Sequence, residues 1–240
     1  MEHETTPEQD SPSIHAPLYE AIAAAYVRGT ITDWPATQAA LFSEPFATLS
    51  AAEHAALIAI GLARQLRLHR FKRTMGLARV SRILGALQGI APANLLDIGS
   101  GRGAFLWPLL DRMPWLPVTA IDMLPHRVAD LRAVATGGIS QLQVHAADVT
   151  ALPFADRQFD CVTMLEVLEH IPDTERALRE VLRVAQRFAL FSVPSQPDNN
   201  PEHIHLFRAD QLEQLLLRCG AIRVNHDAVP GHLILVARVP

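Results

Sequence analysis

The feature that most constrains the fold is an apolar run that ends in a glycine-rich turn, NLLDIGSGRGAF at positions 94–105. Gly99, Gly101 and Gly103 carry no Cβ, so the backbone can turn sharply there and approach a ligand closely. The apolar residues before them are typical of a buried strand, and a helical pattern follows. This order of strand, glycine turn and helix is typical of an open α/β sheet, in which ligands bind at the carboxyl ends of the strands.

Five more strand-like runs follow the turn along the chain. They are PVTAID, LQVHAAD, FDCVTMLEV, RFALFSVP and HLILVARV, and helical patterns follow the first, second, fourth and fifth of the six strands. A Pro-Gly turn in IRVNHDAVPGHLILVARV joins the last strand to one more strand-like run. We therefore predict a doubly wound, Rossmann-like α/β sheet over residues 91–240, mostly parallel, with an antiparallel hairpin at one edge.

The segment before the sheet is predicted to be helical. Residues 16–90 are rich in alanine, leucine and arginine and lack the β-branched runs of strands. Ser50 and Glu53 form a capping-box pattern, which predicts a helix from Ser50 into the low 70s. A second helical pattern, MGLARVSRILGALQG, stops near Gly89 and Pro92. We expect these residues to form an N-terminal helical cap, and the polar residues 1–15 to form a disordered tail.

Composition narrows the class of protein. The 240 residues, 49% of them hydrophobic, suffice for one substantial core with an attached helical segment. A formal net charge of −4 argues against a surface that coats nucleic acid, and the apolar run AALIAIGLA is too short to span a bilayer. Cys161 and Cys219 lie in apolar runs, as expected for buried thiols in a reducing compartment. These features favour a cytoplasmic protein without membrane insertion.

Acidic residues end three of the predicted strands. Asp97 lies two residues before Gly99, and Asp122 and Asp148 close the second and third strands. A carboxylate beside the turn opposes a pyrophosphate and favours a cationic ligand. An acid at the end of the second strand commonly accepts hydrogen bonds from a ribose diol. The three acids predict a pocket for a nucleoside with a positively charged appendage, although the glycine spacing, with Ala104 in the last place, also permits a dinucleotide.

These segments resemble the motifs of the class I S-adenosylmethionine-dependent methyltransferases, in the family related to the ubiquinone-biosynthesis O-methyltransferases. LLDIGSGRGAF is similar to the first motif, AID to the ribose-binding acid, AADVTALPF to the adenine-binding segment and FDCVTMLEVLEHIPD to the fourth-strand motif. The resemblance runs from about residue 94 to the end of the chain. It implies methyl transfer by in-line displacement from S-adenosylmethionine, a reaction that depends chiefly on alignment.

The resemblance also implies roles for individual residues. Asp122 would hold the ribose hydroxyls, Asp148 and Val149 would flank the adenine, and Leu165 and Glu166 would lie beside the sulfonium. The predicted cofactor-binding residues are Asp97, Gly99, Ser100, Gly101, Gly103, Asp122, Met123, Asp148, Val149, Leu165 and Glu166.

The segment after the fourth strand supplies candidates for catalysis. Glu169 and His170 are predicted to take the proton of a hydroxyl or amine acceptor. Glu166, Glu169 and His170, with His203 or His205, also form a set of O and N ligands compatible with Mg²⁺, Mn²⁺ or Zn²⁺. A similar E-x-x-E-H arrangement binds metal in RNA 3′-terminal ribose methyltransferases and in some ubiquinone-pathway enzymes. The alternative is that Glu169 and His170 only build the loop before the helical pattern TERALREVLRVA.

The segment RQLRLHRFKRTMGLARVSR, residues 64–82, holds seven of the 21 lysines and arginines and no acid. One interpretation is a solvated helical face. Another is a lid that receives an anionic acceptor or an RNA end, with Arg70, Arg73 and Arg79 as candidate contacts. His203 and His205, in the polar loop PSQPDNNPEHIHLF, lie on one side of an extended segment and are further candidates.

Several functions stay open at this level. The favoured one is methyl transfer from S-adenosylmethionine to an O or N acceptor of a small, anionic metabolite. An RNA 3′-terminal ribose 2′-O-methyltransferase is the first alternative. A nucleoside-binding pseudoenzyme and an NAD(P)-binding oxidoreductase are the others, because the same kind of sheet serves unrelated functions.

Overall fold

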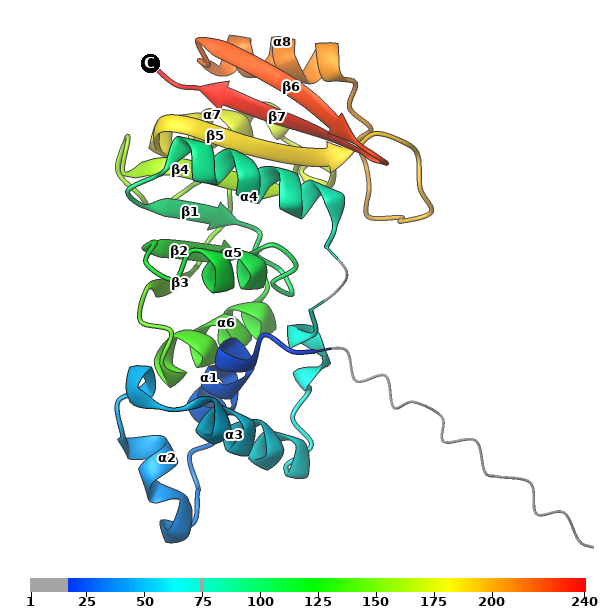
Figure 1. Ribbon diagram of the computed structural model, residues 1–240. Coiled ribbons are helices and arrows are strands. Elements are labelled where there is room, and N and C mark those ends of the chain that lie inside the picture. Colours follow the sequence, from blue (N-terminus) through cyan, green and yellow to red (C-terminus); the bar gives the residue numbers. More distant parts are fainter. Residues whose placement is uncertain (1–16, 74–75) are drawn as a thin grey trace, which may run out of the picture.

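A seven-stranded sheet forms the centre of the computed structural model, which describes residues 17–73 and 76–240 (Figure 1). The predicted tail, residues 1–15, lies outside the described residues. The strand order is β3-β2-β1-β4-β5-β7-β6. The strands are β1 (Leu95–Ile98), β2 (Val118–Asp122), β3 (Leu142–Ala146), β4 (Phe159–Leu165), β5 (Ala185–Pro194), β6 (Arg223–Val229) and β7 (His232–Arg238).

The pairing of the strands confirms the predicted sheet. Strands β1 to β5 pair in parallel, and β7 pairs antiparallel with both β5 and β6, which forms the predicted edge hairpin. β1 lies between β2 and β4, so the direction of winding reverses there. Such a reversal leaves a crevice at the carboxyl ends of the strands, and the glycine turn follows β1 at this point.

Helices cover both faces of the sheet (Figure 1). On one face α4 (Ala78–Ile90), α5 (Leu106–Arg112) and α6 (Pro125–Gly137) share a hydrophobic cluster with strand residues such as Leu95. On the other face α7 (Thr174–Val184) and α8 (Ala209–Cys219) share a second cluster with Leu96. Side chains alternate along a strand, so a strand covered on both faces is apolar throughout. The edge strand β3 departs from this pattern, since His145 and Ala146 are exposed.

The N-terminal segment contacts α6 through α1, and α3 packs on α1. Its helices are α1 (Glu20–Thr30), α2 (Ala39–Ser43) and α3 (Ala51–Ala63), with short 3-10 turns η1 (Ala36–Gln38), η2 (Phe46–Thr48) and η3 (Leu68–Phe71). Figure 1 shows α1 to α3 at the opposite end of the molecule from β6 and β7. A Cβ on Gly29 would lie 1.9 Å from the carbonyl oxygen of Ala133, and one on Gly137 would lie 1.7 Å from that of Ala25. The N-terminal segment is therefore held against α6 by close backbone contacts of α1.

Helix α3 starts where the sequence predicts and ends earlier. Ser50 Oγ accepts a hydrogen bond from the Glu53 amide, and the Glu53 carboxylate accepts one from the Ser50 amide at 2.7 Å. The helix ends at Ala63 because Gln65 adopts a left-handed backbone, with φ of +58°. The Leu66 amide then donates to the Gly61 carbonyl, which closes the helix in a Schellman motif. No helix within residues 17–73 and 76–240 has the length and apolar character needed to cross a bilayer.

Candidate functional site

The glycine turn between β1 and α5 has a left-handed backbone at each predicted glycine. The φ angles are +70° at Gly99, +57° at Gly101 and +80° at Gly103. A Cβ on Gly99 would lie 2.4 Å from a methyl group of Val167, and one on Gly103 would lie 2.0 Å from the Trp107 ring. A Cβ on Gly101 would keep 3.4 Å or more from its neighbours. Side chains of the protein itself pack against Gly99 and Gly103. These contacts, and not the approach of a ligand, require glycine at both positions.

Asp97 is the buried acid beneath the turn. Its side chain is 2% exposed and accepts hydrogen bonds from Ser100 Oγ at 2.7 Å and Thr163 Oγ1 at 2.8 Å. Burial raises the pKa of Asp97 to about 6 despite these hydroxyls, and the nearby Asp122 contributes in the same direction. A carboxylate in such surroundings is stabilised by a cation placed beside it. Thr163, which pairs with Asp97 in the sheet, was not predicted, although a polar residue within the apolar run FDCVTMLEV was a usable signal.

Asp122 ends β2 beside a cavity of about 370 Å³. Its carboxylate accepts hydrogen bonds from the amides of Gly101 and Leu124, both at 2.9 Å, and so ties the glycine turn to β2. Arg127, which was not predicted, lies 3.7 Å from the same carboxylate. The predicted cofactor residues in the cavity wall are Gly99, Asp122, Met123, Asp148, Val149 and Glu166.

A smaller hollow of about 160 Å³ adjoins this cavity. The two share Gly99, Arg127 and Glu166 in their walls. The predicted residues that line the hollow are Asp97, Gly99, Ser100, Gly101, Leu165 and Glu166. The structure therefore places the predicted cofactor residues around two connected spaces, and Gly103 lines neither of them.

Glu166 lies between the two spaces and is held from three sides. It has a left-handed backbone, with φ of +56°. Its carboxylate accepts a hydrogen bond from Ser192 Oγ at 2.6 Å and lies 3.0 Å from His232 Nε2 and 3.8 Å from Arg79 Nε. Ser192 and His232 were not predicted. They reach Glu166 through the register of β5 and β7, which the sequence pattern does not give.

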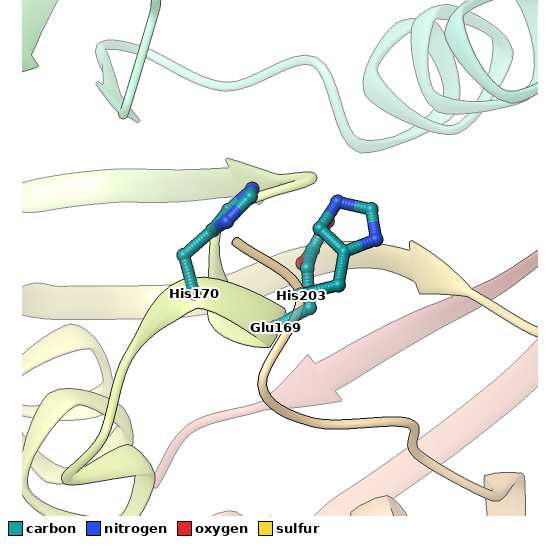
Figure 2. Close-up of side chains that lie close together, drawn as sticks. All are labelled: Glu169, His170 and His203. Carbon is teal, nitrogen blue, oxygen red and sulfur yellow. The ribbon is translucent and has the colours of Figure 1, made fainter. Parts of the chain in front are cut away.

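Three side chains lie close together after β4 (Figure 2), and one of them, His170, lines the cavity. Glu169 and His170 belong to the 3-10 turn η4 (Leu168–His170), and His203 comes from the loop between β5 and α8. The amides of Ile204 and His205 donate to the Glu169 carbonyl at 3.0 and 3.2 Å, which fixes the loop there. One ligand-type atom from each of Glu169, His170 and His203 lies within 4.8 Å of the other two.

The Glu169 side chain is fully buried, with an exposure of 0%. Among the described residues neither of its carboxylate oxygens has a hydrogen-bond partner. Burial raises the pKa of Glu169 to about 8, and the nearby Glu166 contributes in the same direction. Burial of a carboxyl without a hydrogen-bond partner costs folding free energy, so packing alone does not account for a glutamate at this position.

The two imidazoles are oriented by oxygens behind them. His170 Nδ1 lies 2.9 Å from the Glu202 carbonyl oxygen, and His203 Nδ1 lies 2.9 Å from a carboxylate oxygen of Asp198. An Nδ1–H that donates to these acceptors leaves the lone pair of Nε2 free. His203 Nε2 lies 4.0 Å from Glu169 Oε1, and His170 lines the cavity. His203 therefore presents its Nε2 to Glu169, and one ring nitrogen of His170 lies within 4.8 Å of the ligand-type atoms of the other two residues.

The predicted metal set needs correction. His205 places its Nε2 3.0 Å from the Ile171 carbonyl oxygen, and the Glu166 carboxylate is bound by Ser192. The structure groups Glu169 and His170 with His203, and not with Glu166 or His205.

Five of the seven basic residues in segment 64–82 pair with acids. The pairs are Arg64–Asp33, Arg70–Asp130, Arg73–Asp111, Arg79–Glu166 and Arg82–Asp227. Arg73 makes a bidentate pair at 2.8 and 2.9 Å, and Arg70 pairs with an aspartate of α6. Of the three arginines predicted to contact an acceptor, Arg79 lines the hollow beside the glycine turn, whereas Arg70 and Arg73 line neither space. The acids that pair with this segment all lie outside it, between 31 and 145 residues away in sequence.

Comparison with known proteins finds a matching family and related methyltransferases. A family described as "Methyltransferase domain" matches residues 96–192, which run from β1 to β5 and include the glycine turn and Glu169. Malonyl-[acyl-carrier protein] O-methyltransferase of Geobacter sulfurreducens is 29% identical over an alignment of 191 positions, which covers 67% of this chain and 71% of that protein. Ubiquinone biosynthesis O-methyltransferase of Pseudomonas fluorescens is 35% identical over an alignment of 103 positions, which covers 41% of this chain and 42% of that protein.

Solved structures show the same fold. An N-methyltransferase of Haemonchus contortus, in complex with phosphomonomethylethanolamine and S-adenosylhomocysteine, superposes with a TM-score of 0.56 at 15% identity. The match covers 67% of this chain and 52% of that one. The chain also spans about half the length of several other curated relatives that it matches.

Proposed function

Since this chain is a class I S-adenosylmethionine-dependent methyltransferase, we propose that it methylates an oxygen or nitrogen atom of a small molecule. The observation that carries the proposal is the imidazole of His170, which lines the cavity with its Nδ1 bound to the Glu202 carbonyl. A hydroxyl or amine loses a proton when it accepts a methyl group, so a base that faces the cavity accelerates the transfer.

The residues around the two spaces fit S-adenosylmethionine. Asp122 lies where a ribose diol would find an acceptor, and the exposed Met123 and the buried Val149 offer apolar surface for an adenine. Asp97 beneath the turn offers a negative charge to the cationic amino-acid end. The bound cofactor supplies the methyl group on a sulfonium, whose sulfur leaves as a neutral thioether.

The chain's own residues then align the acceptor and remove its proton. His170 Nε2 takes the proton from the acceptor, while its Nδ1–H remains bound to the Glu202 carbonyl and keeps the ring in place. The imidazolium that results lies beside Glu169, whose carboxylate form it stabilises. A positioned base of this kind accelerates a reaction by about 10²–10⁴-fold.

Glu169, His170 and His203 also fit a divalent cation. Glu169 is buried without a partner among the described residues, and two imidazoles with free Nε2 atoms lie beside it. A cation there would orient and acidify an acceptor hydroxyl. Imidazole ligands favour Mn²⁺ or Zn²⁺ over Mg²⁺. The Asp198 carboxylate and the Glu202 carbonyl would fix the ring orientations from behind.

The test of the acceptor class is production of S-adenosylhomocysteine against a panel of phenols, carboxylates, amines and carbon acceptors. We expect turnover with an O or N acceptor, and a loss of about 10²–10⁴-fold in kcat for His170→Ala with little change in cofactor affinity. His226→Ala, on the exposed face of β6, is the control. Full activity of His170→Ala, or turnover of carbon acceptors alone, would contradict the proposal.

The metal is tested separately by calorimetric titration of Mn²⁺ and Zn²⁺ into wild type, Glu169→Gln and His203→Ala. We expect wild type to bind one ion and both variants to bind it more weakly, by about 10-fold or more. Full activity of chelated wild type, with no ion bound in calorimetry, would leave His170 as a simple base.

The ion pairs of Arg70 and Arg73 weigh against an RNA substrate and against an anionic acceptor, because both were inferred from free basic side chains in segment 64–82. A small-molecule acceptor is therefore preferred. The buried free thiols Cys161 and Cys219 accord with a reducing compartment such as the cytoplasm.

A further inference from the structure

His232, the first residue of β7, contacts the acid that lies between the two spaces. Its Nε2 is 3.0 Å from Glu166 Oε2, and its side chain is 23% exposed. A carboxylate oxygen only accepts, so Nε2 carries the hydrogen of this contact. The family match ends at residue 192 and therefore assigns no role to His232.

The backbone around His232 fixes the position of its ring. His232 pairs with Pro194 in the register of β5 and β7. The turn before it contains Gly231, whose φ is +80°, and the Gly231 carbonyl accepts a hydrogen bond from the Ser195 amide at 3.0 Å. The turn of the β6–β7 hairpin is thus tied to the end of β5, beside the candidate site.

Ser192 holds Glu166 from the other side. Its Oγ donates to Glu166 Oε1 at 2.6 Å, and the Glu166 amide donates to the Ser192 carbonyl at 2.9 Å. Ser192 is fully buried in the apolar run RFALFSVP. Each carboxylate oxygen of Glu166 therefore has a donor of its own, whereas Arg79 Nε lies farther away at 3.8 Å. The left-handed backbone of Glu166 is unfavourable for a residue with a Cβ, as is common at functional sites.

The place of Glu166 corresponds to the middle of the proposed cofactor. The larger cavity holds the residues suited to the ribose and the adenine, Asp122 and Val149. The smaller hollow holds Asp97, which suits the amino-acid end. The sulfur joins these two parts of S-adenosylmethionine, and Glu166 lines both spaces. The Glu166 carboxylate thus lies beside the position expected for the sulfonium.

A carboxylate at this position affects the chemical step. In the transfer the acceptor lone pair forms a bond to the methyl carbon, the C–S bond breaks with its electron pair left on sulfur, and the acceptor proton goes to His170. The positive charge on sulfur is lost in this step. A carboxylate that pairs closely with the sulfonium stabilises the bound reactant more than the transition state, and so slows the reaction. A carboxylate held by two fixed donors attracts the sulfonium less and stays in place.

We propose that His232 is a positioning residue, which acts with Ser192 to hold the Glu166 carboxylate away from the sulfonium. This inference rests on the proposed function. It gives the β6–β7 hairpin a part in the reaction site, in addition to its place at the edge of the sheet.

The experiment measures the affinities of S-adenosylmethionine and S-adenosylhomocysteine by calorimetry in wild type and His232→Ala. These ligands differ in the methyl group and the charge on sulfur, so the ratio of their affinities reports how strongly the site binds the sulfonium. His232→Ala should raise this ratio in favour of S-adenosylmethionine by about 3- to 10-fold, because Glu166 loses a donor. His232→Gln keeps an N–H donor and should reverse part of the change. With an acceptor from the panel, kcat and the KM for S-adenosylmethionine should fall together in His232→Ala.

A double-mutant cycle tests whether His232 acts through Glu166. Glu166→Gln carries no negative charge, so the addition of His232→Ala to this variant should leave the affinity ratio unchanged. His226→Ala, on the exposed face of β6 in the same hairpin, should behave as wild type does. Circular dichroism and thermal unfolding verify that each variant is folded.

An unchanged or lowered ratio in folded His232→Ala would make His232 a structural residue of the hairpin and overturn the inference. The same increase in the Glu166→Gln background would also overturn it. If His232→Ala does not fold, Ser192→Ala provides the test, because it removes the donor to the other oxygen and should raise the ratio in the same way. Wild type that binds neither ligand would overturn the proposed function itself.

Discussion

Replacing Asp97 with asparagine should stabilise the ligand-free protein at neutral pH and weaken its cofactor binding. Burial raises the pKa of Asp97 from its ordinary 3.8 to about 6. Between these values the unfolded chain has released the proton that the folded chain still holds, so the folded state loses stability as pH rises from about 4 to 6. A shift of about two pKa units corresponds to about 3 kcal/mol at pH 7.5.

Asparagine carries no charge and so avoids this cost. Its carbonyl can accept from Thr163 Oγ1, and Ser100 Oγ can turn its hydrogen to the Asp97 backbone carbonyl, which lies 3.3 Å away. In a chain of this size about 3 kcal/mol corresponds to a rise in Tm of about 6–12 °C. The same change removes the negative charge offered to the cofactor, so affinity for S-adenosylhomocysteine should fall about tenfold or more.

The assay is urea unfolding of wild type and Asp97→Asn at several pH values from 4 to 8, with calorimetry of S-adenosylhomocysteine at pH 7.5. Because Glu169 also has a raised pKa, the difference between the two proteins isolates Asp97. The difference should be small near pH 4 and reach its full value above pH 6. If Asp97→Asn is less stable than wild type at pH 7.5 and binds the ligand normally, Asp97 is a structural residue of the turn.

Three further variants test the site and the packing. Asp122→Ala should weaken S-adenosylhomocysteine binding at least about tenfold in calorimetry, and unchanged affinity in a folded variant would remove Asp122 from the site. Gly137→Ala should lower the free energy of unfolding by about 1–3 kcal/mol or more, since its Cβ would meet the Ala25 carbonyl. Gly85→Ala, where a Cβ has open space, should raise the free energy of unfolding by about 0.5–1 kcal/mol. Equal effects of the two changes would refute the close packing of α1 on α6. Gln65→Gly should gain about 0.5–1 kcal/mol by relieving the left-handed backbone, and a loss would contradict the Schellman end of α3.

The sheet was predictable because buried parallel strands leave a local signature. Both faces of β1 are covered, so its residues are apolar in succession, and the glycine turn marks its carboxyl end. Asp122 and Asp148 could be predicted to lie close to the glycine turn because the carboxyl ends of parallel strands meet at one edge of a sheet. Helix α3 was predicted too long because nothing in its apolar pattern shows that Gln65 takes a left-handed backbone.

The partners of the site residues were less predictable because they depend on tertiary contacts. His203 and His205 lie on one side of an extended segment, so their spacing cannot decide between them. The hydrogen bonds from loop amides to the Glu169 carbonyl fix the loop so that His203, and not His205, lies in the group with Glu169 and His170. Arg70 pairs with Asp130 on α6, 60 residues away in sequence. The sequence of segment 64–82 alone therefore could not show that this arginine has an acidic partner.

The most direct test of the central claim is a calorimetric comparison of S-adenosylhomocysteine, S-adenosylmethionine and NADPH on the full chain. A methyltransferase with Asp97 beneath its glycine turn should bind one molecule of S-adenosylhomocysteine at least about tenfold more tightly than NADPH, because that carboxylate opposes a pyrophosphate. Tighter binding of NADPH, or no binding of either S-adenosyl ligand by the folded protein, would contradict the assignment.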